Sequence, residues 1–382
     1  MTSAKTQVAF SRLALVGASA TLLLMGMLAA AYGPLLVVLM RRFQVGLPVA
    51  GLVFGAHFGG GLLGVLVSMR GLERIRGRVA LSGSLALLGL GCAGVALAPA
   101  WPLLLGTVFL IGIGFGALDI GINQLVAHSV NPGRVALLNL LNAAYAVGAV
   151  VAPLLVAAAG NRYRGLYAGG AVMAGVVILG WRGVAGGLAA PVANGRAAGS
   201  DASLIVTVVI AFMLYVGVEV GVAGWMPTHL EGIGYSVPAA ATLTSGFWFA
   251  LAVGRFLVAP LTLRVPEPFI VLGGTAIAVL ALVAALVPAV APAAYILAGL
   301  AIAPIFPTGL AWLARLNPGN PRATAWLFPA SMLGGALIPT GLGVVIAGLG
   351  TAWIPAILAA VATGCLAAFA AAGRHRVTVS GE

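Results

Sequence analysis

Long apolar runs separated by short polar connections repeat along the whole chain. Most runs hold about 20 residues, the length that an α-helix needs to cross the hydrocarbon core of a bilayer. They lack the alternating segments of about ten residues that build membrane β-barrels. The pattern therefore predicts an all-α transmembrane fold. Its twelve expected spans are 13–40, 46–69, 79–99, 102–128, 135–159, 165–182, 203–229, 238–262, 268–288, 291–314, 323–348 and 351–373.

The basic residues indicate how these spans are oriented. With the N-terminus in the cytoplasm, 14 of the 19 Lys and Arg residues fall on the cytoplasmic side and four on the outer side, while Arg255 lies inside a span. This bias is the one that cytoplasmic loops of membrane proteins show. The first apolar run continues through Met40, so we interpret it as a span and not as a cleaved signal peptide. We expect a multi-pass protein of the plasma (inner) membrane with both termini in the cytoplasm.

One connection is longer than the others and divides the chain. The stretch 183–202 is polar and rich in Gly, Ala and Ser, as flexible linkers are. It predicts a cytoplasmic linker between an N-terminal six-helix bundle, 1–182, and a C-terminal six-helix bundle, 203–382.

The two predicted bundles repeat each other. Asn131-Pro132-Gly133 follows the fourth span, and Asn317-Pro318-Gly319 follows the tenth span 186 positions later. At the same offset, Gly148 and Pro153 of the fifth span match Gly334 and Pro339 of the eleventh span. These matches indicate a duplicated six-helix unit. In transporters built this way, the substrate path lies at the interface between the halves, near the midplane of the membrane.

Composition excludes several classes of protein. Of 382 residues, 62% are hydrophobic and 7% charged, far fewer charges than soluble proteins have. The net charge of +12 comes from dispersed arginines and does not indicate nucleic-acid binding. Cys92 and Cys365 lie in apolar runs, so neither a disulfide framework nor a metal site is expected. The one lysine, Lys5, is near the N-terminus and cannot serve a P-loop. We expect no enzyme activity, no cofactor and no metal.

Two acidic residues fall inside the expected spans, Asp119 in the fourth and Glu219 in the seventh. A carboxylate in hydrocarbon is costly unless it faces a partner or a water-filled cavity. There it can load and release a proton as the cavity opens to each side. We predict that both residues couple transport to protons. The alternatives are a protonated or amide-paired carboxyl that only ties helices together and, for Glu219, binding of substrate hydroxyls. Tyr215, one turn away, is expected to be a hydrogen-bond neighbour of Glu219.

Amide and aromatic side chains within the spans are candidates for binding a solute. Amides both donate and accept, which suits a polyhydroxylated ligand, although such groups also bond between helices. Aromatic rings can stack on the apolar face of a sugar, although Trp225 is equally suited to anchor the membrane interface. His57 titrates in the useful range but is also explained by hydrogen-bonded packing. The substrate-binding candidates are Tyr32, His57, Asn123, Asn142, Tyr145, Tyr215, Trp225 and Trp248, with Asn139 a weaker one nearer the cytoplasmic end.

Charged residues near the cytoplasmic surface are candidates for gating. Arg255 can snorkel to that surface or form a state-dependent ion pair, with Glu73 and Glu267 as the expected partners. Arg74 and Arg78 share the arginine-rich loop with Glu73 and complete the gating set.

Glycines at GxxxG spacing in the second span, Gly55/Gly59 and Gly60/Gly64, predict close helix contacts. Gly112, Gly114 and Gly116 follow no strand and are not interpreted as a dinucleotide motif.

The chain resembles the major facilitator superfamily in its two six-helix halves, its middle linker and the arginine-rich loop 70–78. It is most similar to the fucose-permease-like sugar:proton symporter branch. That similarity rests on Gly114-Phe115-Gly116 before Asp119 and Asn123, on Leu138-Asn139 before Gly148 and Pro153, on Tyr215 to Glu219 before Trp225, and on Phe247-Trp248 before Gly254-Arg255. The first span here lacks the acidic residue of fucose permease, so a proton relay between spans 1 and 4 is not implied.

These observations predict a secondary active transporter that works by alternating access. Given the resemblance, proton-coupled uptake of a sugar or similar small polar solute is the leading interpretation. The alternative is an efflux antiporter for amphipathic, drug-like compounds, with Met213, Phe247 and Phe249 lining an apolar cavity and Asp119 as its proton site. The expected partners are a small-molecule substrate, protons or Na⁺, and the lipid bilayer. We expect a monomer and no nucleic acid.

Overall fold

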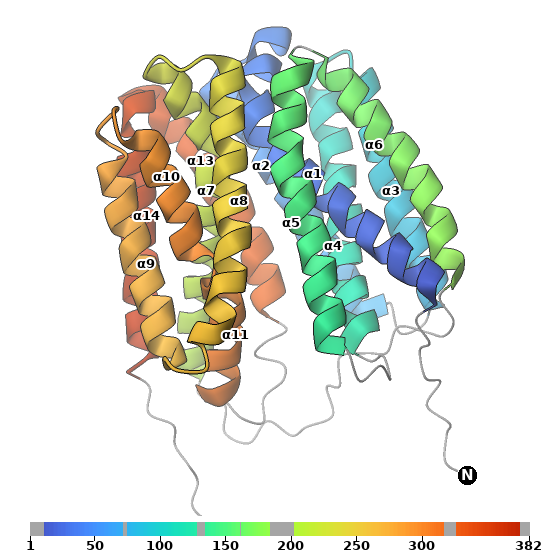
Figure 1. Ribbon diagram of the computed structural model, residues 1–382. Coiled ribbons are helices and arrows are strands. Elements are labelled where there is room, and N and C mark those ends of the chain that lie inside the picture. The colour runs from blue at the N-terminus through green and yellow to red at the C-terminus, as the bar shows by residue number, and fades with distance from the viewer. Residues whose placement is uncertain are drawn as a thin grey trace, which may run out of the picture. The chain divides into compact units, whose positions relative to one another are not determined.

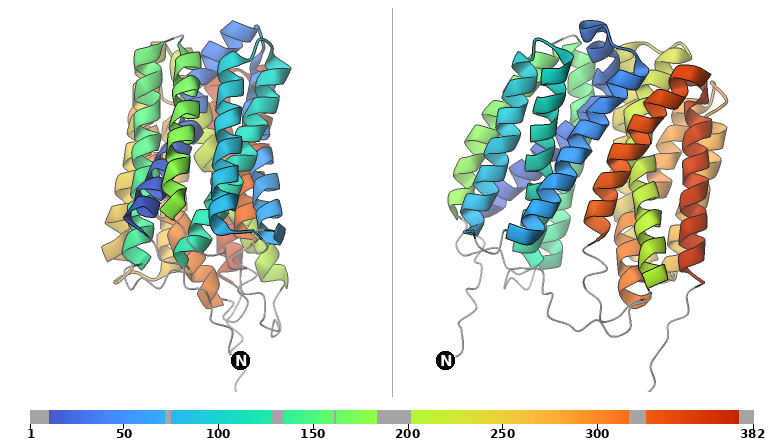
Figure 2. Two further views of the ribbon diagram at one scale, coloured as in Figure 1. Left: turned by 90° about the vertical axis from the view of Figure 1, so that its right-hand side faces the viewer. Right: turned by 180° about the vertical axis from the view of Figure 1, so that it is seen from behind.

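The structure, a computed structural model, describes residues 11–71, 75–127, 134–160, 162–183, 202–316 and 326–374. All elements of these segments are helical, as two further views show (Figure 2). Their bounds are α1 (Arg12–Phe43), α2 (Leu47–Gly71), α3 (Gly77–Leu97), α4 (Trp101–Ala127), α5 (Arg134–Ala159), α6 (Tyr163–Val177), η2 (Ile178–Gly183), α7 (Ala202–Gly232), α8 (Val237–Leu261), α9 (Glu267–Ala284), α10 (Ala291–Ile302), α11 (Ile305–Leu316), α13 (Leu327–Leu349), η3 (Thr351–Trp353) and α14 (Ile354–Ala372).

The prediction of twelve spans is confirmed, because twelve helices of the described chain are long and apolar enough to cross a membrane. The chain is therefore a multi-pass membrane protein with an all-α fold. One of these spans, Ala291–Leu316, is interrupted between α10 and α11. Pro304 stands at the break, where its missing N–H and its ring disfavour a continuous helix. The seventh span extends through Gly232, further than predicted, and places Glu231 in the last turn of α7.

The chain divides into two compact units. Unit 1 comprises Met1–Val45 and Leu52–Pro191, and unit 2 comprises Gly46–Gly51 and Val192–Glu382. Residues 184–201 of the predicted linker and both Asn-Pro-Gly motifs lie outside the described residues. The predicted bundle boundaries stay a prediction.

Each unit uses the same pairs of helices. In unit 1, α1 packs along α5, and α3 packs against both α4 and α6 (Figure 1). In unit 2, α7 packs along α13, and α9 packs against both α10 and α14 (Figure 1). The first and fifth helices of each unit are thus neighbours, and so are the third and sixth. This correspondence supports the interpretation of a duplicated unit.

Glycines bring the first and fifth helices of each unit into close approach. A Cβ atom at Gly148 of α5 would overlap the backbone carbonyl of Leu23 in α1. At the offset of 186 residues, a Cβ atom at Gly334 of α13 would overlap the backbone carbonyl of Met213 in α7. The sequence repeat therefore corresponds to the same helix contact in both units, a contact that only a residue without a side chain allows.

A second glycine contact joins α2 to α4. Cβ atoms at Gly60 and Gly64 would overlap the backbone of α4, and Cβ atoms at Gly112 and Gly116 would overlap the backbone of α2. The predicted helix-contact role of Gly60 and Gly64 is confirmed. Gly59 is less tightly placed, since a Cβ there would only touch the ring of Phe109 at 4.0 Å.

Candidate functional site

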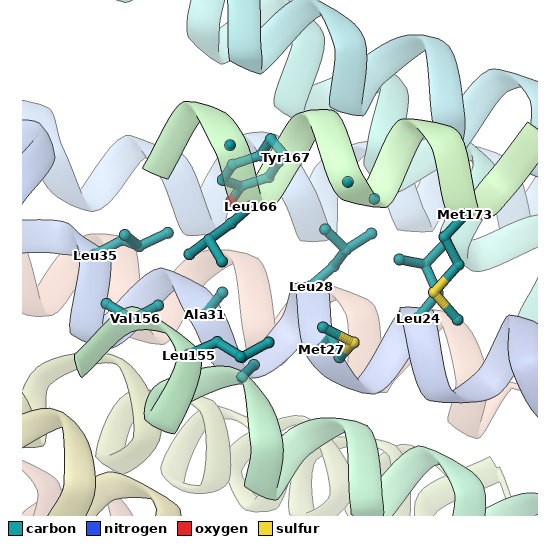
Figure 3. Close-up of a pocket in the computed structure, with 14 residues that line it drawn as sticks. Leu24, Met27, Leu28, Ala31, Leu35, Leu155, Val156, Leu166, Tyr167 and Met173 are labelled. Carbon is teal, nitrogen blue, oxygen red and sulfur yellow. The ribbon is translucent and has the colours of Figure 1, made fainter. Parts of the chain in front are cut away.

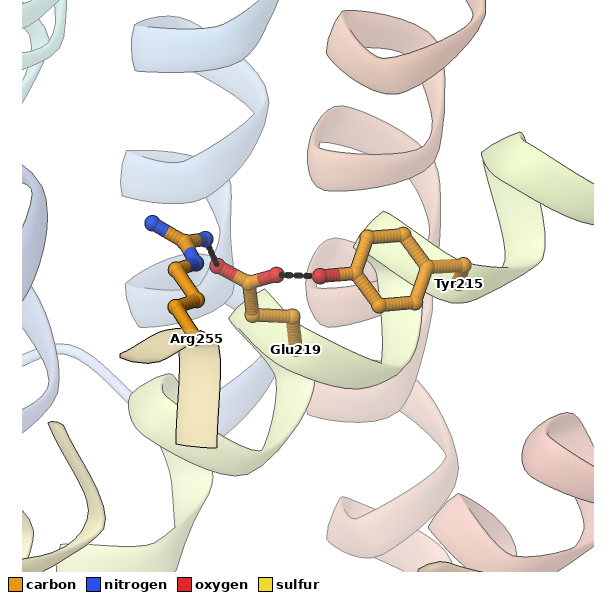
Figure 4. Close-up of polar contacts among 3 residues, drawn as sticks. All are labelled: Tyr215, Glu219 and Arg255. Atoms are coloured by element: carbon orange, nitrogen blue, oxygen red, sulfur yellow. Dashed lines mark hydrogen bonds and ion pairs between the residues drawn. The ribbon is translucent and has the colours of Figure 1, made fainter. Parts of the chain in front are cut away.

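The seventh and eighth spans place three polar side chains together inside unit 2. The hydroxyl of Tyr215 donates to Oε2 of Glu219 at 2.5 Å, and Nη2 of Arg255 lies 3.9 Å from Oε1 of Glu219 (Figure 4). The side chain of Glu219 is 14% exposed and that of Arg255 is 29% exposed. We name Tyr215, Glu219 and Arg255 the α7–α8 cluster. It is a carboxylate held between a neutral donor and a cation.

Local sequence explains how this cluster forms. Tyr215 and Glu219 are four residues apart on α7, so they share one helix face. The chain leaves α7 through Gly234 at φ 103°, a left-handed conformation that glycine adopts readily. Ser236 then accepts a hydrogen bond from the N–H of Ala239 at 3.4 Å and begins α8. A turn this short makes α7 and α8 antiparallel neighbours, which brings Arg255 back toward Glu219.

The ring of Tyr215 has apolar surroundings. The ring of Tyr215 packs against Phe212 and Phe306, with ring centroids 6.4 and 6.3 Å apart. The neighbouring helix α13 has no charged residue, and Arg255 is the only charged residue of α8.

Of the two predicted partners of Arg255, Glu267 is wrong. Arg255 pairs with Glu219, whereas Glu267 accepts from Nη2 of Arg315 at 2.8 Å. Glu219 and Arg255 are brought together by the packing of α7 on α8, a contact that hydropathy alone does not specify. The other expected partner, Glu73, lies outside the described residues together with Arg74, and Arg78 is exposed.

The other intramembrane carboxylate, Asp119, has a different environment in unit 1. Nδ2 of Asn123 donates to the backbone carbonyl of Asp119 at 2.8 Å and to Oδ1 of Asp119 at 3.2 Å. Both residues belong to α4, so this amide pairing does not tie two helices together. No cation forms an ion pair with Asp119 among the described residues. The half-buried carboxyl is therefore balanced by a neutral amide alone.

Tyr32 and His57 form a buried pair in unit 1. The hydroxyl of Tyr32 lies 3.0 Å from Nδ1 of His57, and the rings of Phe58 and Phe115 lie edge-on to the imidazole at 4.9 Å. His57 has no exposed surface, and its Nε2 has no hydrogen-bond partner among the described residues. This arrangement fits the packing interpretation of His57.

The two tryptophan candidates differ in their bonds. Trp225 has no exposed surface, and its Nε1 donates to the carbonyl of Pro339 at 2.8 Å. This hydrogen bond joins α7 to α13, which differs from the predicted role of an anchor at the membrane interface. Trp248 is 5% exposed, and its buried Nε1 lacks a hydrogen-bond partner in the described part of the chain. A ligand with an acceptor could satisfy that donor.

The polar residues of α5 are more open. Asn142 is exposed and Tyr145 is half-buried, while the side chain of Asn139 lies outside the described residues. Asn142 and Tyr145 are one turn apart on the same face of the helix.

Sequence reasoning missed a second tyrosine–histidine pair, in unit 2. The hydroxyl of Tyr295 in α10 lies 3.0 Å from Nδ1 of His229 in α7. A histidine near the end of an apolar run was the available signal, but its tyrosine partner lies 66 positions further along the chain. In the segments that the structure describes, no group of three or more His, Cys, Asp or Glu residues could hold a metal ion.

An apolar cavity of about 250 Å³ lies between α1, α5 and α6 of unit 1 (Figure 3). Leucine and methionine side chains form most of its wall, and none of the predicted site residues lines it. Its lining is Leu24, Met27, Leu28, Ala31, Leu35, Ala152, Leu155, Val156, Gly165, Leu166, Tyr167, Gly169, Gly170 and Met173.

Several solved structures of transporters share this fold. A D-xylose-proton symporter superposes with a TM-score of 0.78 at 13% identity, over 96% of this chain and 98% of that one. The nucleoside transporter NupG (D323A mutant) superposes with a TM-score of 0.76 at 12% identity, over 94% of this chain and 100% of that one. A bacterial homolog of the human lysosomal transporter Spinster gives 0.71 at 15% identity, over 95% and 96%.

The identities are low, so these structures show the fold alone. No curated protein sequence matches this chain. A sequence profile of the Major Facilitator Superfamily matches residues 18–295, which is most of the chain. Fold and family are those of transporters, and the chain belongs to the Major Facilitator Superfamily.

Proposed function

We propose that this protein is a secondary active transporter that works by alternating access and takes up a sugar or similar small polar solute together with protons. The α7–α8 cluster is the observation that supports this most directly. Its carboxylate lies inside a membrane span, where an ionisable group is costly to keep and is usually functional.

Glu219 has two states with different consequences for its neighbours. When it is ionised, it attracts Arg255 and accepts a hydrogen bond from Tyr215. When it is protonated, the attraction to Arg255 is lost while the cation remains. A proton arriving at this carboxylate therefore changes the contact between α7 and α8. Such a link between protonation and helix packing is what proton-driven alternating access requires.

Asp119 is proposed as a second proton site. Its carboxyl has a neutral amide partner and no ion-paired cation among the described residues, so its ionised form leaves an unbalanced charge in unit 1. Loading a proton removes that charge.

The polar groups proposed to bind a polyhydroxylated solute lie in both units. Trp248 of unit 2 has a buried donor, and Asn123, Asn142 and Tyr145 of unit 1 carry amide and hydroxyl groups. The similarity to the fucose-permease-like branch and to the fold of a D-xylose-proton symporter favours a sugar.

We further propose that Arg255 takes part in gating through its ion pair, that both termini lie in the cytoplasm, and that the protein acts as a monomer of the plasma membrane.

A proton-coupled efflux antiporter for amphipathic compounds is the second candidate. The apolar cavity of unit 1 favours it, because leucine- and methionine-lined space suits a hydrophobic ligand. We also expected an efflux antiporter to have an apolar cavity lined by Phe247 and Phe249, but the positions of these two side chains do not support that expectation. Phe247 is fully buried and Phe249 is 60% exposed, so they lie on different sides of α8.

Purified protein in proteoliposomes separates the two functions. With an inward proton gradient, accumulation of radiolabelled sugars above equilibrium is the result expected for uptake. Proton release driven by amphipathic drugs and unaffected by sugars would instead establish efflux. Protein-free liposomes and liposomes without a gradient are the controls.

A further inference from the structure

The apolar cavity of unit 1 is a groove with positively charged residues at one end. We propose that it binds an anionic phospholipid, with one acyl chain in the groove and the phosphate of the headgroup at Arg162 and Arg164. None of the residues proposed to bind solute or protons lines the groove. The inference therefore goes beyond the proposed function and does not depend on it.

The groove has the length of a lipid chain. Along α1 its wall extends from Leu24 to Leu35, which is about 16 Å along the helix axis. Figure 3 shows Leu35 at one end of the groove and Leu24 with Met173 at the other. One leaflet of a bilayer contributes about 15 Å of hydrocarbon, half of the total thickness. A chain aligned with the helices can therefore occupy the groove over most of one leaflet.

The groove opens on the surface of unit 1. Leu155 of α5 is 37% exposed, and Gly165 and Gly169 of α6 are exposed. A Cβ atom at either glycine would meet nothing within 4 Å, in contrast to Gly148, where it would overlap the backbone of α1. No helix contact requires glycine at these two positions, and the missing side chains leave the mouth open. A chain can enter sideways from the bilayer.

The lining of the groove suits hydrocarbon and not water. Of its 14 residues, only Tyr167 has a polar side chain, and Tyr167 is buried. Because lipid tails are as apolar as leucine, a chain in the groove gains packing contacts but no hydrophobic free energy relative to the bilayer. The groove therefore positions a chain, and selectivity for one lipid has to come from the headgroup.

Two arginines lie where the groove reaches the beginning of α6. Arg162 is the N-cap residue of α6, and its spacing of four and seven residues from Leu166 and Gly169 places it on the helix face that lines the groove. Arg164 is in the first turn, where its Nη2 donates to the carbonyl of Ala98 at 3.5 Å. Both arginines are exposed. A headgroup above a chain in the groove can therefore reach them.

The end of α1 brings two further arginines to the same region. Its last turn holds Arg41 and Arg42. The ring of Phe43 lies 5.7 Å from that of Trp101, which begins α4 directly after the turn that Arg164 contacts. These four arginines are the basic residues that the sequence assigns to the outer side, against the usual cytoplasmic bias. They make this end of unit 1 strongly basic.

No acidic residue balances this charge in the described part of unit 1. Arg162 and Arg164 form no ion pair among the described residues. Asp119 is the only acidic residue of unit 1 that the structure describes, and it lies in the second half of α4, away from the end at Trp101. The phosphate of an anionic lipid supplies the missing negative charge, and its oxygens match the planar fork of arginine.

Photoreactive lipids test the site with the full-length protein in phosphatidylcholine vesicles. Two probes carry the same acyl chains, with a diazirine on one of them, and differ in their headgroup, phosphatidylglycerol or phosphatidylcholine. Mass spectrometry of peptides after illumination locates the label. We expect the phosphatidylglycerol probe to label groove residues such as Leu155 and Met173 about 25-fold more than the phosphatidylcholine probe does, about fivefold for each of two arginines beside an anionic headgroup.

Variants test the groove and the headgroup contacts separately. Gly169→Leu fills the groove from α6 and should abolish the labelling of groove residues. Gly175→Leu is its matched control and should label as the wild type, because a Cβ there also meets nothing within 4 Å and Gly175 does not line the groove. Arg162→Gln should lower labelling by the phosphatidylglycerol probe about fivefold. Arg182→Gln, at an exposed arginine at the other end of the same span, should label as the wild type. Unchanged melting temperatures in detergent verify that the variants fold.

Three results would overturn the proposal. Equal labelling by the two probes in the wild type would exclude selection of an anionic headgroup, and this comparison needs no variant to fold. Undiminished labelling in Gly169→Leu, or an equal loss in Gly175→Leu, would show that the chain does not lie in the groove. Displacement of the probe from the groove by amphipathic drugs would identify a drug site in place of a lipid site. The readout does not involve transport, so each result is independent of the proposed uptake of a solute.

Discussion

The intramembrane carboxylates of the two units have different neighbours. Asp119 is bonded to an amide of its own helix and has no ion-paired cation among the described residues, whereas Glu219 is held by Tyr215 and faces Arg255. Loss of a proton from Asp119 creates an unbalanced charge in unit 1. Loss of a proton from Glu219 completes an ion pair in unit 2. The two units share a scaffold, but the ionised form of Asp119 has no cation beside it among the described residues, whereas the ionised form of Glu219 has Arg255.

The scaffold itself is shared. Gly148 of unit 1 and Gly334 of unit 2 make the same contact between the first and fifth helices, 186 residues apart in sequence. The comparison shows that the packing of the helices was retained in both units while the polar groups inside them diverged. Experiments can test the difference between the acids and the likeness of the contacts separately.

The largest expected effect is on the coupling of solute transport to the proton gradient. Asp119→Asn keeps the size of the side chain and a partner for Asn123 but removes the proton site. We expect gradient-driven accumulation in proteoliposomes to fall to the equilibrium level, while exchange of labelled for unlabelled solute continues. Glu231→Gln, near the end of α7, is the control and should accumulate normally. Unchanged accumulation in Asp119→Asn would exclude a coupling role for this residue.

The second-largest expected effect is a loss of stability, and it tests whether the first and fifth helices make equivalent contacts in the two units. Gly148→Ala and Gly334→Ala each place a methyl group on the backbone of a neighbouring helix, which should cost about 1–3 kcal/mol of folding free energy. The melting temperature in detergent measures it. Gly341→Ala is the matched control in α13, because a Cβ there meets nothing within 4 Å. If only one of the two substitutions destabilised the protein, the contacts would not be equivalent.

A smaller effect tests the hydrogen bond that Glu219 accepts. Tyr215→Phe removes the hydroxyl that donates to Oε2 of Glu219, a bond to a charged group worth about 1.5 kcal/mol. The free energy of unfolding in detergent should fall by about that amount. Tyr235→Phe, outside the cluster, is the control and should leave the free energy of unfolding unchanged. Unchanged stability in Tyr215→Phe would contradict the hydrogen bond as described.

The smallest expected effect concerns Trp225. Trp225→Phe loses the bond to the carbonyl of Pro339 and should lower the free energy of unfolding by about 1 kcal/mol. Solute affinity should stay within about twofold of the wild type, because the indole has no exposed surface in the structure. Loss of binding without loss of stability would instead support the substrate-stacking role predicted from the sequence.

Local features were predictable because neighbouring residues on a helix have known geometry. The number of spans follows from hydropathy and helix length, and the contact of Tyr215 with Glu219 follows from their spacing of four residues. The close packing of Gly60 and Gly64 was predicted from their GxxxG spacing, since small residues are what tightly packed membrane helices need, but the spacing did not show which helix they meet.

Features that join different helices required the tertiary structure. The sequence alone did not show that Arg255 pairs with Glu219, that Trp225 bonds Pro339, or that His229 meets Tyr295. The physical reason is that lipid and protein interior are both apolar, so hydropathy does not reveal which face of a membrane helix turns inward. The sequence determined the helices and their repeat, and only the packing of those helices decided which polar groups meet.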